Sequence, residues 1–341
     1  MAVMAALHEK SLPRPKIQTQ IFSHRGIAGS IAILVACLSL VPSSFAQSDA
    51  LAASSFAFAA PSLPTINRQV EEVGLVLTVT NKKGRFVHNL NESDFNILDN
   101  GRAPERITYF QAQTDLPLRV ALVLDTSDSV TYRFAFEQKA ASTFFRHVLR
   151  PPRDLGLIVA FNQEVHVAQE ATDNVKALST ALKSLRPGGE TAVYDAVLTA
   201  ARELAAIRDP QPSRHAIILI TDGEDNRSHS RLQHAVESVL RSDSIVYVVS
   251  TNSAESSIGL AGEGDAAMKQ LAEATGGRLL RADSDGDVSA AFGKIERELR
   301  SQYAIGYKPA SGGPDGLFHR LVVMGPKKLQ IFHRLGYFAH R

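Results

Sequence analysis

The stretch LRVALVLDTSDS, residues 118–129, is the most informative part of this sequence about its fold. Its first seven residues form a nearly continuous apolar run, which is typical of a strand buried on both faces of a parallel sheet. The run ends at Asp125, and Ser127 and Ser129 follow it two residues apart. Because alternate side chains of an extended loop point the same way, both hydroxyl groups can face one point. The stretch therefore predicts a buried strand with a polar loop at its carboxyl end.

Strands and helices alternate from this stretch to residue 299. Further apolar strands are expected over residues 155–161, 215–220, 245–249 and 277–281. Helices are expected over residues 133–149, 175–185, 192–207, 232–240, 267–275 and 288–299. This alternation predicts an α/β fold with a doubly wound, mostly parallel sheet that is covered on both faces. Ligands of such sheets bind beyond the carboxyl ends of the strands, so the loops that follow the strands matter most.

Two other polar loops are expected at the same edge of the sheet. TDGED, residues 221–225, follows one strand, and PGGET, residues 187–191, opens a helix. Oxygen atoms of Asp, Ser and Thr suit a hard divalent cation, either Mg²⁺ or Mn²⁺. Gly188 and Gly189 allow the backbone of their loop to approach closely. The alternative is that Ser127 and Ser129 only cap the helix that follows them.

Asp-x-Ser-x-Ser, a distant Thr and a later Thr-Asp-Gly together resemble the von Willebrand factor type A domain, over roughly residues 118–299. The resemblance implies a Rossmann-like fold and a metal-ion-dependent adhesion site made of Asp125, Ser127, Ser129, Thr191 and Asp222. It implies that the two serines and sometimes the threonine bind Mg²⁺ or Mn²⁺ directly, and that the aspartates bind it directly or through water. The neighbours that can modulate such a site are Glu224 and Gly189.

The segments on either side of this domain, which we assign to residues 116–300, indicate β-structure. Residues 73–80 predict a strand, and residues 95–110 predict a hairpin with Asn100-Gly101 at its tip. Three more strands are expected over residues 302–307, 318–324 and 329–338. Neither end is large enough to bury a core alone. We therefore expect residues 67–115 and 301–341 to pack together as one domain that resembles a β-sandwich.

The first 46 residues are expected to be a signal peptide rather than part of the fold. They are basic, with an apolar run of about 16 residues, shorter than the roughly 20 that span a membrane comfortably, and a cleavage pattern ending at Ala46. The alternatives are an uncleaved membrane anchor and a lipoprotein that is lipidated at Cys37. Residues 47–66 are rich in Ala, Ser and Pro, which predicts a linker. The flanking sequences at 94–101 and 303–307 resemble bacterial exported "VWFA-related" proteins.

Composition excludes several classes of protein. The chain has 341 residues with 37 Lys and Arg against 35 Asp and Glu, and this balance argues against a dedicated nucleic-acid binder. Hydrophobic residues make up 44% and charged residues 21%, which excludes a mostly disordered chain. The single cysteine excludes a disulfide scaffold and a zinc site built from cysteines.

Two further patterns resemble sites but have simpler explanations. Residues 283–287 imitate the start of a calcium loop, yet Val288 stands where Gly is expected and Lys294 where Glu is needed, so a turn and a helix cap are expected. His319, His333 and His340 lie among basic residues, which predicts a solvated basic strand face. A polymer-binding surface is the alternative for these histidines.

The function expected from these observations is that of an exported, non-enzymatic binding module in the periplasm, in the cell envelope or outside the cell. Its cation would capture an exposed Asp or Glu of a protein partner, as in adhesion. The rival is a metal-dependent hydrolase or phosphoryl-transfer enzyme, for which Glu224 is the best general-base candidate. A third possibility is a structural envelope protein that the metal only stabilises.

Overall fold

The computed structural model describes residues 72–339, apart from 113–115, 210–211, 253–259 and 311–314. The expected signal peptide, its alternatives at Cys37 and the linker of residues 47–66 lie outside the described residues. Within the described part of the chain, none of the helices is both long and apolar enough to cross a membrane.

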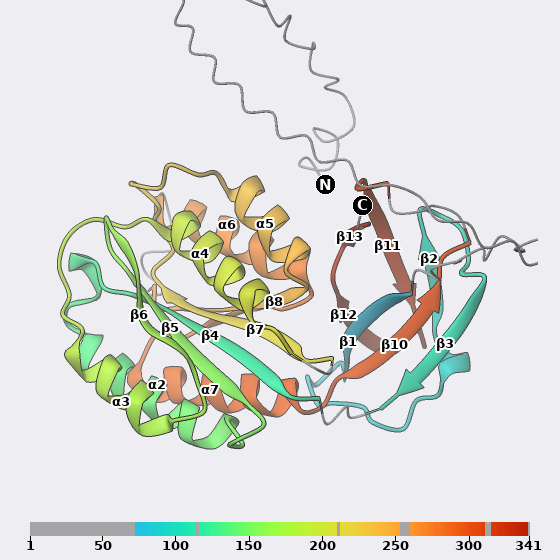
Figure 1. Cartoon of the computed structure of the whole chain (residues 1–341), viewed down its shortest axis with the longest axis horizontal. Coiled ribbons are helices and arrows are strands. Elements are labelled where there is room, and N and C mark those ends of the chain that lie inside the picture. The colour runs from blue at the N-terminus through green and yellow to red at the C-terminus, as the bar shows by residue number, and fades with distance from the viewer. Residues whose placement is uncertain (1–71, 113–115, 210–211, 253–259, 311–314, 340–341) are drawn as a thin grey trace, which may run out of the picture. The chain divides into compact units, whose positions relative to one another are not determined.

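A six-stranded sheet forms the centre of the α/β domain, in the order β6-β5-β4-β7-β8-β9 (Figure 1). Its strands are β4 (Leu118–Asp125), β5 (Leu155–Phe161), β6 (Val165–Thr172), β7 (Arg214–Thr221), β8 (Ser244–Ser250) and β9 (Leu279–Arg281). All neighbouring pairs are parallel except β5 and β6. Every residue of β4 is buried, as the apolar run at 118–124 predicts.

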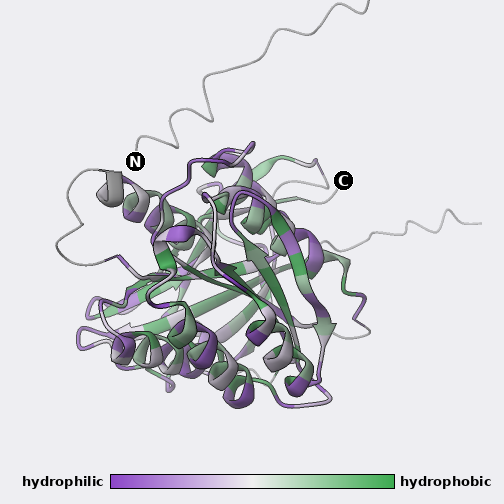
Figure 2. Ribbon diagram, turned by 90° about the vertical axis from the view of Figure 1, so that its left-hand side faces the viewer, coloured by the Kyte–Doolittle hydropathy of each residue, from purple (hydrophilic) through white to green (hydrophobic). Residues whose placement is uncertain are grey.

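Three helices cover each face of this sheet (Figure 1). One layer consists of α2 (Phe134–Val148), α3 (Val175–Ser184) and α7 (Asp285–Leu299), and the other of α4 (Val193–Ala206), α5 (Leu232–Arg241) and α6 (Leu260–Thr275). Alternate residues of β4 serve the two cores, because Leu122 packs with the first layer and Val123 with the second. In Figure 2, the strands of the sheet are accordingly largely green, the colour of hydrophobic residues. The predicted doubly wound, mostly parallel sheet is confirmed.

The edge strand β6 was not among the predicted strands. It pairs only with β5, and none of its residues is fully buried. A strand at the edge of a sheet needs no continuous apolar face, so its sequence carries a weak pattern.

Two antiparallel sheets combine strands from both ends of the described chain. One has the order β12-β1-β10-β3 and the other β13-β11-β2. The strands are β1 (Val73–Asn81), β2 (Asn96–Asp99), β3 (Arg106–Gln111), β10 (Tyr303–Lys308), β11 (Phe318–Met324), β12 (Leu329–His333) and β13 (Gly336–Phe338). Residues of both sheets share one hydrophobic core. The expected packing of the N-terminal segment with the C-terminal segment is confirmed.

The predicted hairpin over residues 95–110 is wrong, although its turn exists. Asn100 and Gly101 have positive φ angles of 49° and 79°, and Asp99 and Arg102 exchange backbone hydrogen bonds of 2.8 and 2.9 Å. The strands on either side then separate, because β2 pairs with β11 and β3 pairs with β10. Pro104 has no N–H group and cannot continue a ladder beyond the turn.

The buried carboxylate of Asp99 joins the two antiparallel sheets. Tyr307 of β10 and Tyr337 of β13 donate hydrogen bonds to its Oδ2 atom at 2.9 and 2.8 Å, and Nδ1 of His319 lies 3.3 Å from Oδ1. The expectation that His319 belongs to a solvated strand face is therefore wrong. The period-2 pattern of β11 points His319 inward together with Leu321.

Candidate metal centre

Hydrogen bonds bring the Ser127 loop and the Gly189 loop together. The backbone N–H of Gly188 donates to the carbonyl of Thr126 at 2.7 Å, and the N–H of Asp128 donates to the carbonyl of Gly189 at 2.9 Å. Gly189 has a φ of 92°, and a Cβ atom there would lie 2.7 Å from the side-chain oxygen of Gln163. Glycine is therefore needed at this position.

Asp125 ends β4 and connects its loop to the loop after β7. Its side chain is fully buried; Oδ1 accepts the backbone N–H of Ser127 at 2.9 Å, and Oδ2 accepts the hydroxyl of Thr221 at 2.7 Å. Burial raises the pKa of Asp125 to about 6, although the hydrogen bonds from Ser127 and Thr221 lower it. The carboxylate thus orients both neighbouring loops.

Ser127 and Ser129 direct their hydroxyl groups at each other, as their spacing predicts. The two Oγ atoms lie 3.0 Å apart, and Ser127 has an extended backbone with φ −71° and ψ 172°. Ser127 makes no side-chain hydrogen bond to the short turn Asp128–Val130, and Arg133 is the N-cap residue of α2. The geometry therefore does not favour the alternative in which these serines only cap a helix.

The loop that contains Thr191 and the loop that contains Asp222 are also hydrogen-bonded to each other. Asn226 accepts the N–H of Thr191 through its side chain at 3.0 Å and donates its own N–H to the Thr191 carbonyl at 3.0 Å. Asn252 donates from its side-chain amide to the carbonyl of Asp222. The Oδ1 atom of Asp222 is buried and has no hydrogen-bond partner among the described residues.

This donor set fits a divalent cation. An orphaned buried carboxylate oxygen needs an explanation, and a bound ion is one of the few that proteins offer. Hydroxyl and carboxylate oxygens are the ligands that Mg²⁺ prefers. The loops of all five predicted ligands, Asp125, Ser127, Ser129, Thr191 and Asp222, are joined by the hydrogen bonds given above.

The two acids after Asp222 have different environments. Glu224 is exposed to solvent. Asp225 is half-buried and accepts hydrogen bonds from the N–H of Val193 at 2.9 Å and from the Ser228 hydroxyl at 2.6 Å. It therefore caps the start of α4, and burial raises its pKa.

Two further residues at this site were not foreseen. Glu137 in the first turn of α2 is fully buried, and burial followed by the charge of Asp125 raises its pKa to about 8. Gly264 of α6 lies against the Asp222 loop, since a Cβ atom there would meet the carbonyl oxygen of Gly223 at 2.6 Å. Helical spacing from Phe134 to Ala141 would have placed Glu137 on the buried face of α2, but no local pattern indicates Gly264.

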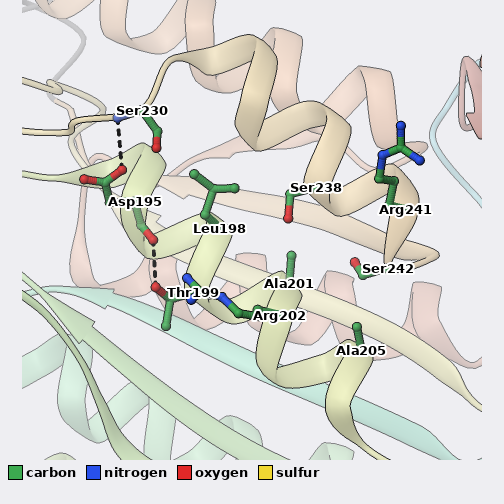
Figure 3. A pocket seen from close by; sticks show the side chains of 10 residues that line it. All are labelled: Asp195, Leu198, Thr199, Ala201, Arg202, Ala205, Ser230, Ser238, Arg241 and Ser242. Atoms are coloured by element: carbon green, nitrogen blue, oxygen red, sulfur yellow. Dashed lines mark hydrogen bonds between the residues drawn. The ribbon is translucent and has the colours of Figure 1, made fainter. Parts of the chain in front are cut away.

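A separate groove of about 500 Å³ lies between α4 and α5 (Figure 3). It contains none of the five predicted ligands; its lining residues are Asp195, Leu198, Thr199, Ala201, Arg202, Ala205, Ser230, Ser238, Arg241 and Ser242. At one end Asp195 accepts the N–H of Ser230 at 3.1 Å, and its carbonyl accepts the hydroxyl of Thr199 at 2.9 Å.

Comparisons with known proteins found several solved structures that are similar to part of this chain. Similar solved structures include the conserved hypothetical protein BatB from Bacteroides thetaiotaomicron, with 18% identity over 54% of this chain and 100% of that chain and a TM-score of 0.43. An aerotolerance-related membrane protein from Bacteroides fragilis has 20% identity over 53% and 98%, with a TM-score of 0.43. A von Willebrand factor type A protein from Catenulispora acidiphila has 12% identity over 79% and 74%, with a TM-score of 0.45. No curated protein matches the chain.

The family model that matches the sequence covers residues 120–224 and therefore includes the loops of Asp125, Thr191 and Asp222. Its description is the von Willebrand factor type A domain. The six-stranded sheet with helices on both faces agrees with the fold that the sequence resemblance implies. Residues 120–224 of this chain thus match the von Willebrand factor type A domain.

Proposed function

We propose that this chain is a non-enzymatic binding module that holds a divalent cation, Mg²⁺ or Mn²⁺, and captures an acidic residue of a partner protein. The proposed ligands are Asp125, Ser127, Ser129, Thr191 and Asp222. The observation that supports the proposal most strongly is the buried Oδ1 atom of Asp222, which has no hydrogen-bond partner in the part of the chain that the structure describes. It lies in a loop cluster that also holds the paired hydroxyls of Ser127 and Ser129.

The charge of these ligands favours capture of a partner carboxylate. Three of the five are neutral hydroxyl groups, so two carboxylates face a doubly charged cation. Such a cation keeps affinity for another anionic oxygen, which the side chain of an Asp or Glu can supply. Recognition by this route depends on the metal and discriminates against partners that lack a carboxylate.

The proposal places the protein outside the cytoplasm, in the cell envelope or in the medium. Its support is the basic, apolar N-terminal sequence that ends at Ala46. The absence of enzymatic activity is part of the same proposal. An activity that disappears in Glu224→Ala would favour the hydrolase alternative, whereas partner binding is expected to persist in that variant.

Water proton relaxation of bound Mn²⁺ tests the open coordination position. We expect wild-type protein to enhance the relaxation rate, because water completes the coordination of the ion, and a Glu-containing peptide to reduce the enhancement more than its Gln analogue. Thr191→Ala is expected to weaken Mn²⁺ binding, whereas Thr199→Ala, a change of the same type within α4, is not. Equal effects of the two peptides would contradict capture of a carboxylate, and an absence of Mn²⁺ binding would contradict the metal site.

A further inference from the structure

We propose that Glu137 is a positioning residue of the metal centre, which strengthens cation binding by adding a third carboxylate charge from within the core. The inference rests on the proposed function, because it concerns the same cation. No motif of the sequence points to this residue, since it lies eight residues beyond Ser129 in the first turn of α2.

The burial of Glu137 is unlike that of other acids in the structure. Six acids are buried among the described residues: Asp99, Asp125, Glu137, Asp154, Asp265 and Glu298. Five of them have polar partners; for example, Asp154 accepts the N–H of Leu118 at 2.8 Å, and Glu298 pairs with Arg278 at 2.5 Å. Neither carboxyl oxygen of Glu137 has a hydrogen-bond partner within the described part of the chain.

An unpartnered buried carboxyl group is costly, so its presence calls for a compensating interaction. An apolar side chain would complete the buried stripe of α2, where Phe134, Ala141 and Phe145 are all buried. The carboxyl group therefore opposes the packing of this stripe. A cation near its oxygen atoms would supply the missing interaction.

The charges around Glu137 are mostly negative. The groups that act on it are Asp125, Asp222 and Asp285, which raise its pKa, and Arg133, which lowers it. Arg133 donates hydrogen bonds to the carbonyl groups of Thr251 and Ala282, so its guanidinium is engaged at the ends of β8 and β9. One arginine does not balance this group of acids. A divalent cation held by the loops of Asp125 and Asp222 would offset much of their negative charge.

This arrangement predicts a measurable effect on metal affinity. Residues that support metal ligands from outside the coordination sphere change affinity by about 10–100-fold when they are replaced. We therefore expect Glu137→Gln, which keeps the size of the side chain and removes its charge, to weaken Mn²⁺ binding by at least about 10-fold. Glu137→Asp keeps the charge and is expected to bind more tightly than Glu137→Gln.

The experiment measures free Mn²⁺ by electron paramagnetic resonance during titration of the full chain. Glu170→Gln is the control, because it makes the same change at an exposed position of edge strand β6 and should leave affinity unchanged. Thermal melting in chelator is measured in parallel. Because Glu137→Gln replaces a buried carboxyl group that has no hydrogen-bond partner among the described residues, it is expected to melt at the same or a higher temperature while it loses affinity. A purely structural role would change both quantities in the same direction.

The outcomes separate this inference from the proposed function. Equal Mn²⁺ affinity of wild type and Glu137→Gln would overturn the role of Glu137 and leave the metal site standing. An absence of Mn²⁺ binding by wild type would overturn both. If Glu137→Gln fails to fold, Glu137→Met, which fills the same space with an apolar side chain, replaces it in the titration. Wild-type affinity in that variant would also overturn the inference.

Discussion

Asp125 and Glu137 connect the protonation of single residues to the stability of the fold. Burial raises the pKa of Asp125 from 3.8 to about 6 and that of Glu137 from 4.5 to about 8. The folded protein therefore retains protons that the unfolded chain releases. The contribution of these protons to stability is fully present below about pH 4, near the pKa values of the unfolded chain. It is lost as the pH rises through the pKa values of the folded protein.

We predict that the free energy of unfolding of the metal-free protein falls between pH 5 and pH 8. One pKa unit corresponds to about 1.4 kcal/mol, so Glu137→Gln should raise the free energy of unfolding at pH 8 by about 2–4 kcal/mol. Urea unfolding followed by circular dichroism in chelator measures both quantities. An identical pH dependence in wild type and in Glu137→Gln would show that this carboxyl group does not titrate as described.

The close approach of Gly264 to Gly223 gives a second prediction at the residue scale. A Cβ atom at Gly264 would lie 2.6 Å from the Gly223 carbonyl oxygen, so Gly264→Ala must displace either α6 or the Asp222 loop. We expect a loss of about 1–3 kcal/mol in stability and weaker Mg²⁺ binding. In the control Gly286→Ala, the new Cβ would lie at an ordinary contact distance, 3.7 Å, from the Ser284 hydroxyl oxygen. Equal melting temperatures of the two variants would refute the steric argument.

The five candidate ligands could be named from the sequence, because their residue types follow β4 and β7 or, for Thr191, precede α4. Ser127 and Ser129 illustrate this, since a spacing of two in an extended loop brings their hydroxyl groups together. Glu137 and Gly264 could not be assigned to the site in this way. Their importance depends on which atoms face them across the fold, and that is a property of tertiary packing.

At the scale of elements, the Asp99 carboxylate links strands of two sheets. Its removal should therefore lower the free energy of unfolding substantially. Asp99→Ala deprives the hydroxyl groups of Tyr307 and Tyr337 of their common acceptor. We expect a loss of about 2–4 kcal/mol, measured by chemical denaturation. Tyr307→Phe removes only one donor and should cost less. The role of this cluster is disproved if Asp99→Ala unfolds at the denaturant concentration of wild type.

Strand pairing was harder to predict than strand position. The pattern at 95–110 contains two strands and a tight turn, all of which exist, yet β2 and β3 belong to different sheets. Residues 329–338 were expected as one strand but form β12 and β13, again in different sheets. Local pattern specifies an extended backbone, whereas the choice of partner depends on strands more than 200 residues away, such as β10 and β11.

At the scale of the whole molecule, the N-terminal strands depend on the C-terminal segment. In one sheet β10 lies between β1 and β3, and in the other β11 lies between β13 and β2. A chain that ends at Leu299 is therefore expected to lose hydrogen-exchange protection throughout Val73–Asn81, because β1 loses both of its neighbours. Protection of β1 at the wild-type level in the shortened chain would contradict this dependence.

The α/β domain and the joining of the two chain ends were both predictable, because alternation of strands with helices and the small size of each end constrain the architecture strongly. What the pattern does not specify is the polar contacts across the fold. Examples are Asp99 with its tyrosines and Glu137, whose carboxyl group has no hydrogen-bond partner within the described ranges. Each is an ordinary acid in the sequence and becomes distinctive only in its buried setting.

Calorimetric titration of Mg²⁺ into metal-free protein tests whether the loops of Asp125, Ser127, Thr191 and Asp222 form a metal centre. The variant is Asp125→Ala combined with Ser127→Ala, and the control is Ser142→Ala, which removes a hydroxyl from a serine pair that joins α2 to α3. We predict saturable binding at one site in wild type and in the control, and none in the double variant. Equal binding by the double variant, or no binding by wild type, would contradict the assignment of these loops as a metal centre.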